Sequence, residues 1–290
     1  MFYTRPPIRS KCSPSIGYRS ACTLLVLLAG TAALAFGRGA LAATTSVDTL
    51  IQVLFGDLPA SDGVDANNDG AITVADVVLA VPVLFEGVVS DLVPHAVNDQ
   101  LVYRDTDPLG VVTTETTTVV SSDPGGAFVI DDEEVDNNHQ IITHELQSYT
   151  DSGMKLLYDG YTDEVNNAFT TCSPPLRRMV MPLIAGQSFS TTIDCSVYST
   201  LDGTYIGDSN ETDVFTPIEI VDSIEVAAGT FTHVVHINGS RQVIGAALET
   251  HESYFASGVG PILDLMTIGG QTTRTELESG TIGGVPVVPR

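Results

Sequence analysis

Residues 111–121 read VVTTETTTVVS, a run of valines and threonines that contains a single acid. β-branched residues favour strands, because their stiff side chains pack well on a pleated, half-buried surface. Segments of similar composition recur along the rest of the chain, so the sequence predicts strands throughout this region. The other predicted strands are residues 127–130, 139–149, 188–198, 219–226, 231–238, 250–255 and 261–268.

Short clusters of turn-forming residues separate the predicted strands, and several of them are pairs that suit tight hairpin turns. No stretch beyond Gly87 carries a sustained helical stripe of apolar residues. The pattern therefore predicts an antiparallel, mainly β domain over residues 93–290. The predicted turns are residues 123–126 (DPGG), 159–160 (DG), 201–203 (LDG), 238–239 (NG) and 269–270 (GG).

The first 42 residues have the three parts of a secretory signal peptide. Residues 1–19 contain four basic residues and no acid, residues 21–36 are an apolar run, and residues 40–42 (ALA) form a small-x-small cleavage site. Cleavage after Ala42 is expected. The alternative is an uncleaved membrane anchor, but the apolar run is shorter than the ~20 residues that a spanning helix needs. No membrane span is expected after cleavage.

The remaining chain is strongly acidic. The whole sequence has 12 Lys+Arg against 36 Asp+Glu, and five of the basic residues lie in residues 1–42, which leaves 7 against 36, or −29. Such a surface disfavours nucleic acid as a partner and attracts divalent cations and basic molecules. It also keeps an exported protein soluble, and the charge alone does not separate these roles.

Two short apolar-faced helices are predicted on either side of an acidic loop, over residues 44–55 and from Thr73 to about Pro82. The loop, residues 65–76, reads DANNDGAITVAD and places oxygen ligands at the spacing of an EF-hand-type calcium site. Gly70 allows the sharp turn in its middle. Oxygen ligands without His or Cys select calcium over transition metals. The expected Ca²⁺ ligands are Asp65, Asn67, Asp69, Ala71 through its carbonyl, Thr73 and Asp76.

The loop and its exiting helix resemble one repeat of a type I dockerin, because Asp76 closes the site where an ordinary EF-hand has Glu. The resemblance covers about residues 62–85 of a module that spans residues 43–90. It implies a cohesin-like or other surface protein as a partner. Dockerins usually carry two such repeats, and Val74 and Ala75 stand here where many of them place a Ser/Thr pair for the cohesin.

Cys172 and Cys195 are the two cysteines that remain after signal cleavage. A pair of cysteines in an oxidising compartment predicts a disulfide bond. A metal or redox site is the alternative, and it would be favoured by a closer spacing or a neighbouring histidine, neither of which is present.

Four segments of the β region resemble, in order, a group of uncharacterised secreted bacterial β domains. They are residues 92–103 (LVPHAVNDQLVY), 182–189 (PLIAGQSF), 226–231 (VAAGTF) and 254–260 (YFASGVG). That group is similar to the strongly curved antiparallel sheets of periplasmic lipoprotein carriers. The resemblance implies a curved antiparallel sheet or half-barrel, which could hold an apolar ligand.

Catalytic patterns such as G-x-S-x-G, the P-loop and H-E-x-x-H are absent from the sequence. In the predicted strand at residues 231–238, His233 and His236 are expected on opposite faces, with His233 as a core or rim histidine beside Phe231. His139, His144 and His251 lie in strand-like segments without metal-ligand spacing. Residues 131–136 (DDEEVD) are expected at a solvated hairpin tip, with a weak second cation site as the alternative.

These observations favour an exported, calcium-binding and non-enzymatic protein that binds a ligand or takes part in surface assembly. We expect it to be secreted, periplasmic or on the cell surface of a bacterium. The alternative is a polysaccharide-active protein that is attached to a complex through the dockerin-like module. Converging carboxylates on the concave face of the β domain would favour the enzyme, and a wholly apolar trough would favour the binding protein.

Overall fold

The structure, a computed structural model, describes residues 83–289. The expected signal peptide, the calcium loop at residues 65–76 and most of the module at residues 43–90 lie outside the described residues. Within the described range the chain is almost entirely β, which confirms the mainly β prediction.

The elements follow one another along the chain with short turns, and one short helix precedes the main sheet. They are β1 (Val83–Phe85), α3 (Val89–Leu92), β2 (Gln100–Thr106), β3 (Val112–Ser122), β4 (Ala127–Val135), β5 (Ile141–Asp151), β6 (Lys155–Asp163), β7 (Ala168–Val180), β8 (Leu183–Ile184), β9 (Phe189–Ser199), β10 (Tyr205–Val226), β11 (Gly229–Val243), β12 (Glu249–Ala256), β13 (Gly260–Ile268), β14 (Gln271–Ile282) and β15 (Val285–Pro286).

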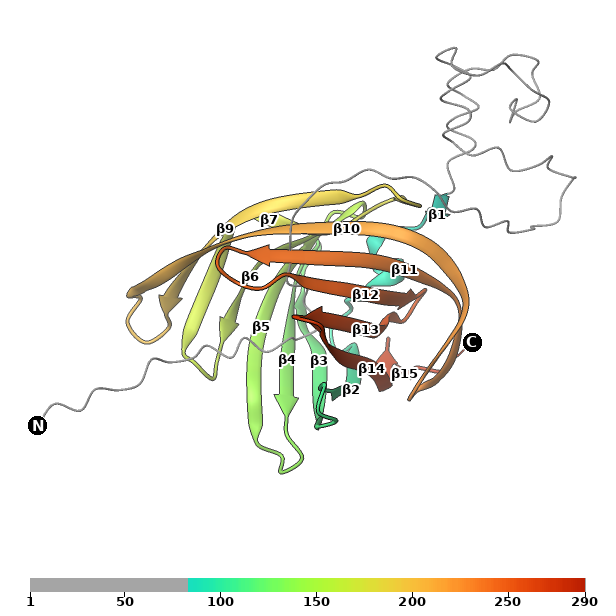
Figure 1. The fold of residues 1–290 in the computed structure, drawn as a ribbon, viewed down its shortest axis with the longest axis horizontal. Helices are drawn as coiled ribbons and strands as arrows, with labels where there is room; N and C mark the ends of the chain where they lie inside the picture. Colours follow the sequence, from blue (N-terminus) through green and yellow to red (C-terminus); the bar gives the residue numbers. More distant parts are fainter. Residues whose placement is uncertain (1–82, 290) are drawn as a thin grey trace, which may run out of the picture. The chain divides into compact units, whose positions relative to one another are not determined.

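Twelve strands form one closed ring, in the order β13-β12-β11-β10-β9-β7-β6-β5-β4-β3-β2-β14, and β14 pairs with β13 again (Figure 1). All strand pairs of the ring are antiparallel. The short strand β15 extends β14, and β1 pairs with β8 in a separate small sheet. The expected antiparallel sheet is therefore present, and it closes on itself instead of ending as a half-barrel.

Ring closure depends on residues that are far apart in the sequence. Arg274 to Thr281 of β14 pair with β2 in antiparallel register. Just outside that ladder, the backbone N–H of Gly283 donates a hydrogen bond of 2.7 Å to the carboxylate of Asp99. The local sequences of β2 and β14 do not predict this pairing, because each has the composition of an ordinary half-buried strand.

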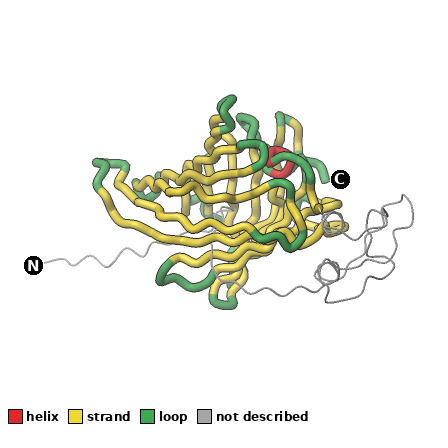
Figure 2. The backbone as a smooth tube through the Cα atoms, turned by 90° about the horizontal axis from the view of Figure 1, so that it is seen from above, coloured by secondary structure: helices red, strands yellow, loops and turns green. Residues whose placement is uncertain are grey.

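The short helix α3, red in Figure 2, covers one end of the ring. Val89 and Leu92 are fully buried. The N–H of Val89 donates to the carbonyl of Gly153 in the β5–β6 turn, and the N–H of Gly258 in the β12–β13 turn donates to the carbonyl of Asp91. These bonds tie α3 to turns on two separate parts of the ring, so the helix lies across its end.

The longest strand, β10, continues beyond β9 and ends in a hairpin that folds against β14. The N–H of Ala228 in this hairpin donates to the carbonyl of Leu277 at 2.8 Å. A buried apolar cluster lies beneath it. Its members are Tyr103, Val226, Phe231, Val234, Ala256, Ile262, Leu263 and Leu277.

Two predicted turns are wrong. The Asp159-Gly160 pair lies inside β6 and the Asn238-Gly239 pair inside β11. At both positions glycine permits close packing: a Cβ on Gly160 would lie 2.1 Å from the carbonyl oxygen of Thr170, and one on Gly239 would meet Phe215 and His251 at 3.4 Å. The turns predicted at residues 123–126, 201–203 and 269–270 do lie between strands.

Candidate functional site in the interior of the ring

Side chains that face the inside of the ring change from apolar to charged along β3, β4, β5 and β12. In β4 the inward series is Phe128, Ile130, Asp132 and Glu134, starting at the end that α3 covers. Strands β3, β5 and β12 repeat this order, because alternate residues of a strand share one face. The corresponding series are Val119, Thr117 and Glu115 in β3, Tyr149, Gln147 and Glu145 in β5, and Phe255, Ser253, His251 and Glu249 in β12. The interior therefore has an aromatic end beneath α3 and a charged end opposite.

The charged end contains a chain of ion pairs between β10, β11, β12 and β13. Arg241 donates to Glu211 at 2.6 Å and lies 3.8 Å from Glu249. His251 bridges two carboxylates, with Nε2 3.1 Å from Glu249 and Nδ1 2.9 Å from Asp264. All of these groups are largely buried, so each charge is stabilised by the neighbouring charges and not by water.

Asp213 and Arg178 connect this chain to the middle of the interior. Asp213 has no exposed surface, and its carboxylate lies 3.9 Å from Nη1 of Arg178. The guanidinium of Arg178 also lies over the ring of Tyr158, with Cζ 4.6 Å from the ring centre. A planar cation on an aromatic face is a favourable arrangement in a buried site.

Burial shifts the pKa values of two interior acids, Asp213 and Asp105, upward. Burial raises the pKa of Asp213 to about 8, against the opposing effect of Arg178. Burial, with the nearby Glu134 and Asp264, raises the pKa of Asp105 to about 7 although Thr275 donates a hydrogen bond to it. For His251, burial alone would lower the pKa, but Asp264 and Glu249 raise it to about 10, so the imidazolium is retained at neutral pH. The interior thus holds several groups whose protonation depends on their neighbours.

The aromatic end of the interior encloses a cavity of about 100 Å³. Four rings line it, those of Tyr103, Phe128, Tyr149 and Phe255, and Val93 and Pro94 close it next to α3. At the opposite side of the cavity lie Glu115, Asp132, Gln147 and Arg178. The cavity therefore has an apolar wall and a charged floor.

The floor is organised by hydrogen bonds. Gln147 donates through its amide to Asp132 at 3.0 Å and to Glu145 at 3.1 Å, and its carbonyl accepts from the hydroxyl of Tyr149 at 2.7 Å. Burial raises the pKa of Tyr149 to about 12. Tyr149 is therefore a neutral hydrogen-bond donor at physiological pH.

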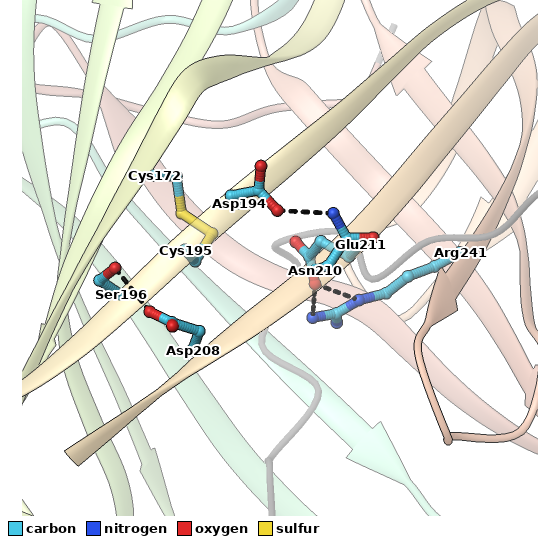
Figure 3. The surroundings of a disulfide bond; sticks show 8 residues. All are labelled: Cys172, Asp194, Cys195, Ser196, Asp208, Asn210, Glu211 and Arg241. Carbon is cyan, nitrogen blue, oxygen red and sulfur yellow. Dashed lines mark hydrogen bonds and ion pairs between the residues drawn. A yellow bond between two sulfur atoms is a disulfide. The ribbon is translucent and has the colours of Figure 1, made fainter.

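The predicted disulfide between Cys172 and Cys195 is confirmed. The two residues are directly paired in the β7–β9 ladder and are bonded to each other. Figure 3 shows the bond beside two exposed polar pairs that join β9 to β10, Asp194 with Asn210 and Ser196 with Asp208. The disulfide lies on the wall of the ring, and it is separate from the cavity lining.

The prediction for His233 is wrong. His233 adopts a left-handed backbone (φ 53°) and is exposed. This residue interrupts the alternation of β11, so Val234 joins Phe231 in the apolar cluster. His236 is the buried histidine of the pair, and its ring stacks on Tyr254 with centres 4.5 Å apart. Period-two reasoning fails here because it assumes an unbroken pleat.

The expected hairpin tip at residues 131–136 is also wrong for most of its length. Residues 131–135 belong to β4, and the turn begins only at Asp136. Asp132 and Glu134 face the interior, while Asp131 pairs with His144 on the outer face at 2.9 Å. His139 lies in the β4–β5 turn, with φ 59°. His251, which has no other potential metal ligand at a suitable spacing in the sequence, belongs to the interior ion-pair chain.

The interior residues that the sequence analysis missed include Arg178, Glu211, Asp213 and Arg241. For two of them the sequence held a signal. Glu211, Asp213 and Phe215 are alternate residues of one strand, so the two acids share the face of Phe215. Among residues 83–289, no group of three or more His, Cys, Asp or Glu side chains has an arrangement that could hold a metal ion. In the same range, no helix has the length and hydropathy needed to cross a membrane.

Comparisons with known proteins give structural neighbours only. No protein-family model matches the sequence. No curated protein matches it either. A crystal structure from Bacteroides fragilis, described as an exported protein with a YmcC-like fold, is similar with a TM-score of 0.49 and 10% identity, covering 65% of this chain and 97% of that one. A crystal structure from Parabacteroides distasonis, described as a lipoprotein, is similar with a TM-score of 0.45 and 12% identity, covering 69% and 99%.

Proposed function

We propose that this protein is an exported, non-enzymatic binding protein whose β domain takes a small apolar or amphipathic group into the ring beneath α3. The cavity with four aromatic rings on one side and charged groups on the other is the observation that carries the proposal. Apolar cavities with a few convergent polar groups are the usual form of small-molecule sites. The expected secreted, periplasmic or cell-surface location agrees with the descriptions of the two structural neighbours.

The volume of the cavity limits what can enter. At about 100 Å³, it is smaller than the roughly 150 Å³ engineered cavity that admits benzene, and well below the ~300 Å³ at which drug-sized ligand pockets begin. A short alkyl chain fits such a space, and a sugar ring of a polysaccharide does not. The interior carboxylates alone therefore do not favour the polysaccharide-active alternative.

Thermal unfolding of the full chain with a panel of small short-chain compounds, such as 1-propanol and 1-butanol, tests the proposal. A ligand at a hundred times its Kd should stabilise the fold by about 2.7 kcal/mol and raise Tm accordingly. Val119→Phe points a larger side chain into the cavity and should abolish the effect. Val120→Phe changes the neighbouring residue, which is 45% exposed, and should retain it. A panel without any effect on Tm, or an unchanged response in Val119→Phe, would refute the proposal.

Calcium binding by the loop at residues 65–76 stays a proposal from the sequence. It is supported by the complete set of oxygen ligands at EF-hand spacing. Titration of the full chain with Ca²⁺ by calorimetry should give a binding heat that Asp65→Ala removes, and equal heats for the two proteins would contradict it. Recognition of a cohesin-like surface protein by the same module is the further partner that the dockerin resemblance suggests.

A further inference from the structure

A groove of about 410 Å³ lies on the outer wall of the ring, across β10 to β14, which lie side by side in Figure 1. Phe215 and His251 face the interior, so the residues that follow them, Thr216 and Glu252, face outward and line the groove. The groove is therefore separate from the cavity beneath α3. Its volume lies within the range of roughly 300–1,000 Å³ that small-molecule sites occupy.

The strand register arranges the outward side chains of the groove in rows that cross the strands. The first row, with one residue from each of β10 to β13, consists of Thr216, Asn238, Glu252 and Leu265. The next row, two residues further along each strand, contains Thr250, Thr267 and Thr272 of β12 to β14. Five strands about 4.8 Å apart give the groove a length of roughly 19 Å. The site is elongated and suits a ligand of several linked units.

The lining favours a ligand that carries many hydroxyl groups. Threonine hydroxyls and the amide of Asn238 can both donate and accept hydrogen bonds, and the carboxylate of Glu252 accepts them. The hydroxyls of Thr267 and Thr272 bond to each other at 2.8 Å and keep one donor for a ligand. In the described part of the chain, no lysine or arginine lines the groove, so an anion has no counter-charge there. An apolar ligand would leave the polar groups desolvated and unpaired, which is costly.

The backbone of these strands is already used by the ring. Each strand from β10 to β14 has a paired neighbour on both sides. An extended peptide binds by adding to an open strand edge, and this part of the described sheet offers none. Recognition at the groove therefore depends on side chains.

An aromatic pair occupies the row on the other side of the first. His236 pairs with Tyr254 in the ladder, two residues beyond Asn238 and Glu252, or about 7 Å along the strands. The two rings stack with centres 4.5 Å apart, and the hydroxyl of Tyr254 lies 3.5 Å from the carboxylate of Glu252. In the described part of the chain, neither ring nitrogen of the buried His236 makes a hydrogen bond, and Glu219 is 3.7 Å from Nδ1. A buried polar group of this kind needs a hydrogen-bond partner.

We propose that the groove binds a neutral oligosaccharide, with one sugar ring packed against Tyr254 and the sugar hydroxyls bonded to the threonines, Asn238 and Glu252. The C–H groups of a pyranose ring form an apolar face with partial positive charge, which suits the negative face of an aromatic ring. The hydroxyls around the same ring match the donors and acceptors of the lining. This site is independent of the ligand proposed for the cavity beneath α3.

Calorimetric titration of the full chain at pH 7 tests the proposal. The neutral probes are the hexasaccharides of cellulose, xylan, mannan, amylose and chitin, and the anionic probe is hexagalacturonate. At least one neutral hexasaccharide should bind about tenfold or more tightly than hexagalacturonate, because Glu252 and the acidic surface repel a carboxylate-bearing chain.

Substitutions on the outer wall then locate the site. Tyr254→Ala removes the aromatic surface and Glu252→Ala the charged acceptor, and each should weaken binding about tenfold or more. Tyr254→Phe keeps the ring and should retain most of the affinity. Two matched controls on β10 should leave the affinity unchanged: Tyr205→Ala, at a 52% exposed position, and Glu225→Ala, also exposed. If Tyr254→Ala does not fold, Glu252→Ala at its exposed position decides the question.

Each outcome bears on this inference separately from the proposed cavity ligand. No binding of any neutral hexasaccharide would overturn it, and so would equally tight binding of hexagalacturonate. Unchanged affinity in both Tyr254→Ala and Glu252→Ala would overturn the assignment to the groove. Val119→Phe, which fills the cavity, should bind the hexasaccharide as the wild type does; loss of binding in this variant would place the sugar inside the ring and overturn the outer site.

Discussion

Asp213→Asn should remove a defined part of the pH dependence of stability. Asp213 has no exposed surface, and burial raises the pKa of its carboxyl to about 8 in the folded protein. In the unfolded chain the pKa returns to about 3.9. Between these values the unfolded state releases the proton and the folded state keeps it.

The sign follows from this difference. A carboxyl group with a raised folded-state pKa contributes stability that is fully present below the unfolded pKa and is lost as pH rises through the folded pKa. The loss amounts to about 1.4 kcal/mol per pH unit, or on the order of 5 kcal/mol between pH 4 and pH 8. Asparagine has nearly the same shape and cannot ionise, so the variant should lack this slope. It should therefore gain stability relative to the wild type as pH rises.

Urea unfolding at pH 4.5, 6, 7.5 and 9, followed by tyrosine fluorescence, measures the effect. The chain has nine tyrosines and no tryptophan, so the tyrosine signal is unobscured. Asp222→Asn, at an exposed position of the same strand, controls for the loss of one charge. The difference in the free energy of unfolding between Asp213→Asn and wild type should change by several kcal/mol over this range. A difference that is independent of pH would refute the reasoning.

Three further predictions concern single features of the ring. Replacing Cys172 and Cys195 by alanine opens a loop of 23 residues and should lower the free energy of unfolding by about 3 kcal/mol, measured in urea without reductant; a change below about 1 kcal/mol would contradict the loop-entropy argument. Gly160→Ala should destabilise by about 3 kcal/mol or more because its Cβ would collide with the backbone of β7, whereas Gly207→Ala, with open space around it, should change little; equal Tm values for the two variants would refute this. His251→Gln should lower the free energy of unfolding by about 3 kcal/mol at pH 6, and by less as pH rises towards 10. The reason is that the raised pKa of His251 makes the stabilisation by its imidazolium fully present below pH 6.5 and lost as pH rises through 10. An equal loss of stability at pH 6 and pH 10 would contradict a charged His251 in the folded protein.

Local sequence patterns predict strands and many of the turns, because β-branched composition and turn chemistry act within a few residues. Two of the failures share one cause. Gly160 and Gly239 carry the signature of a hairpin turn, yet glycine is present there because a neighbouring strand or side chain approaches closely. Sequence reasoning cannot separate these two uses of glycine, since both need a residue without a side chain.

The interior site was less accessible to prediction than the fold. From the sequence, Asp132 and Glu134 are expected at a solvated hairpin tip, because a run of four acids is usually exposed. The face of β4 that carries them is buried only because the sheet closes into a ring. Arg178 reaches the same interior from β7, a strand that is not adjacent to β4 in the sheet. The partners that make buried charge tolerable come from distant parts of the sequence, so the local pattern does not contain them.

Closure of the ring between β2 and β14 has a kinetic consequence. Most strands can pair with the strand just before them, but the closing contact joins residues such as Arg104 and Glu276, which are 172 positions apart along the chain. Long-range contacts form slowly, because the entropy of closing the loop must be overcome first. Until β14 is available, β2 presents an unpaired edge that can recruit a second chain. The interval between emergence of β2 and of β14 is therefore the period in which this protein is most exposed to aggregation, and a circular permutant that makes these two strands a hairpin should shorten it.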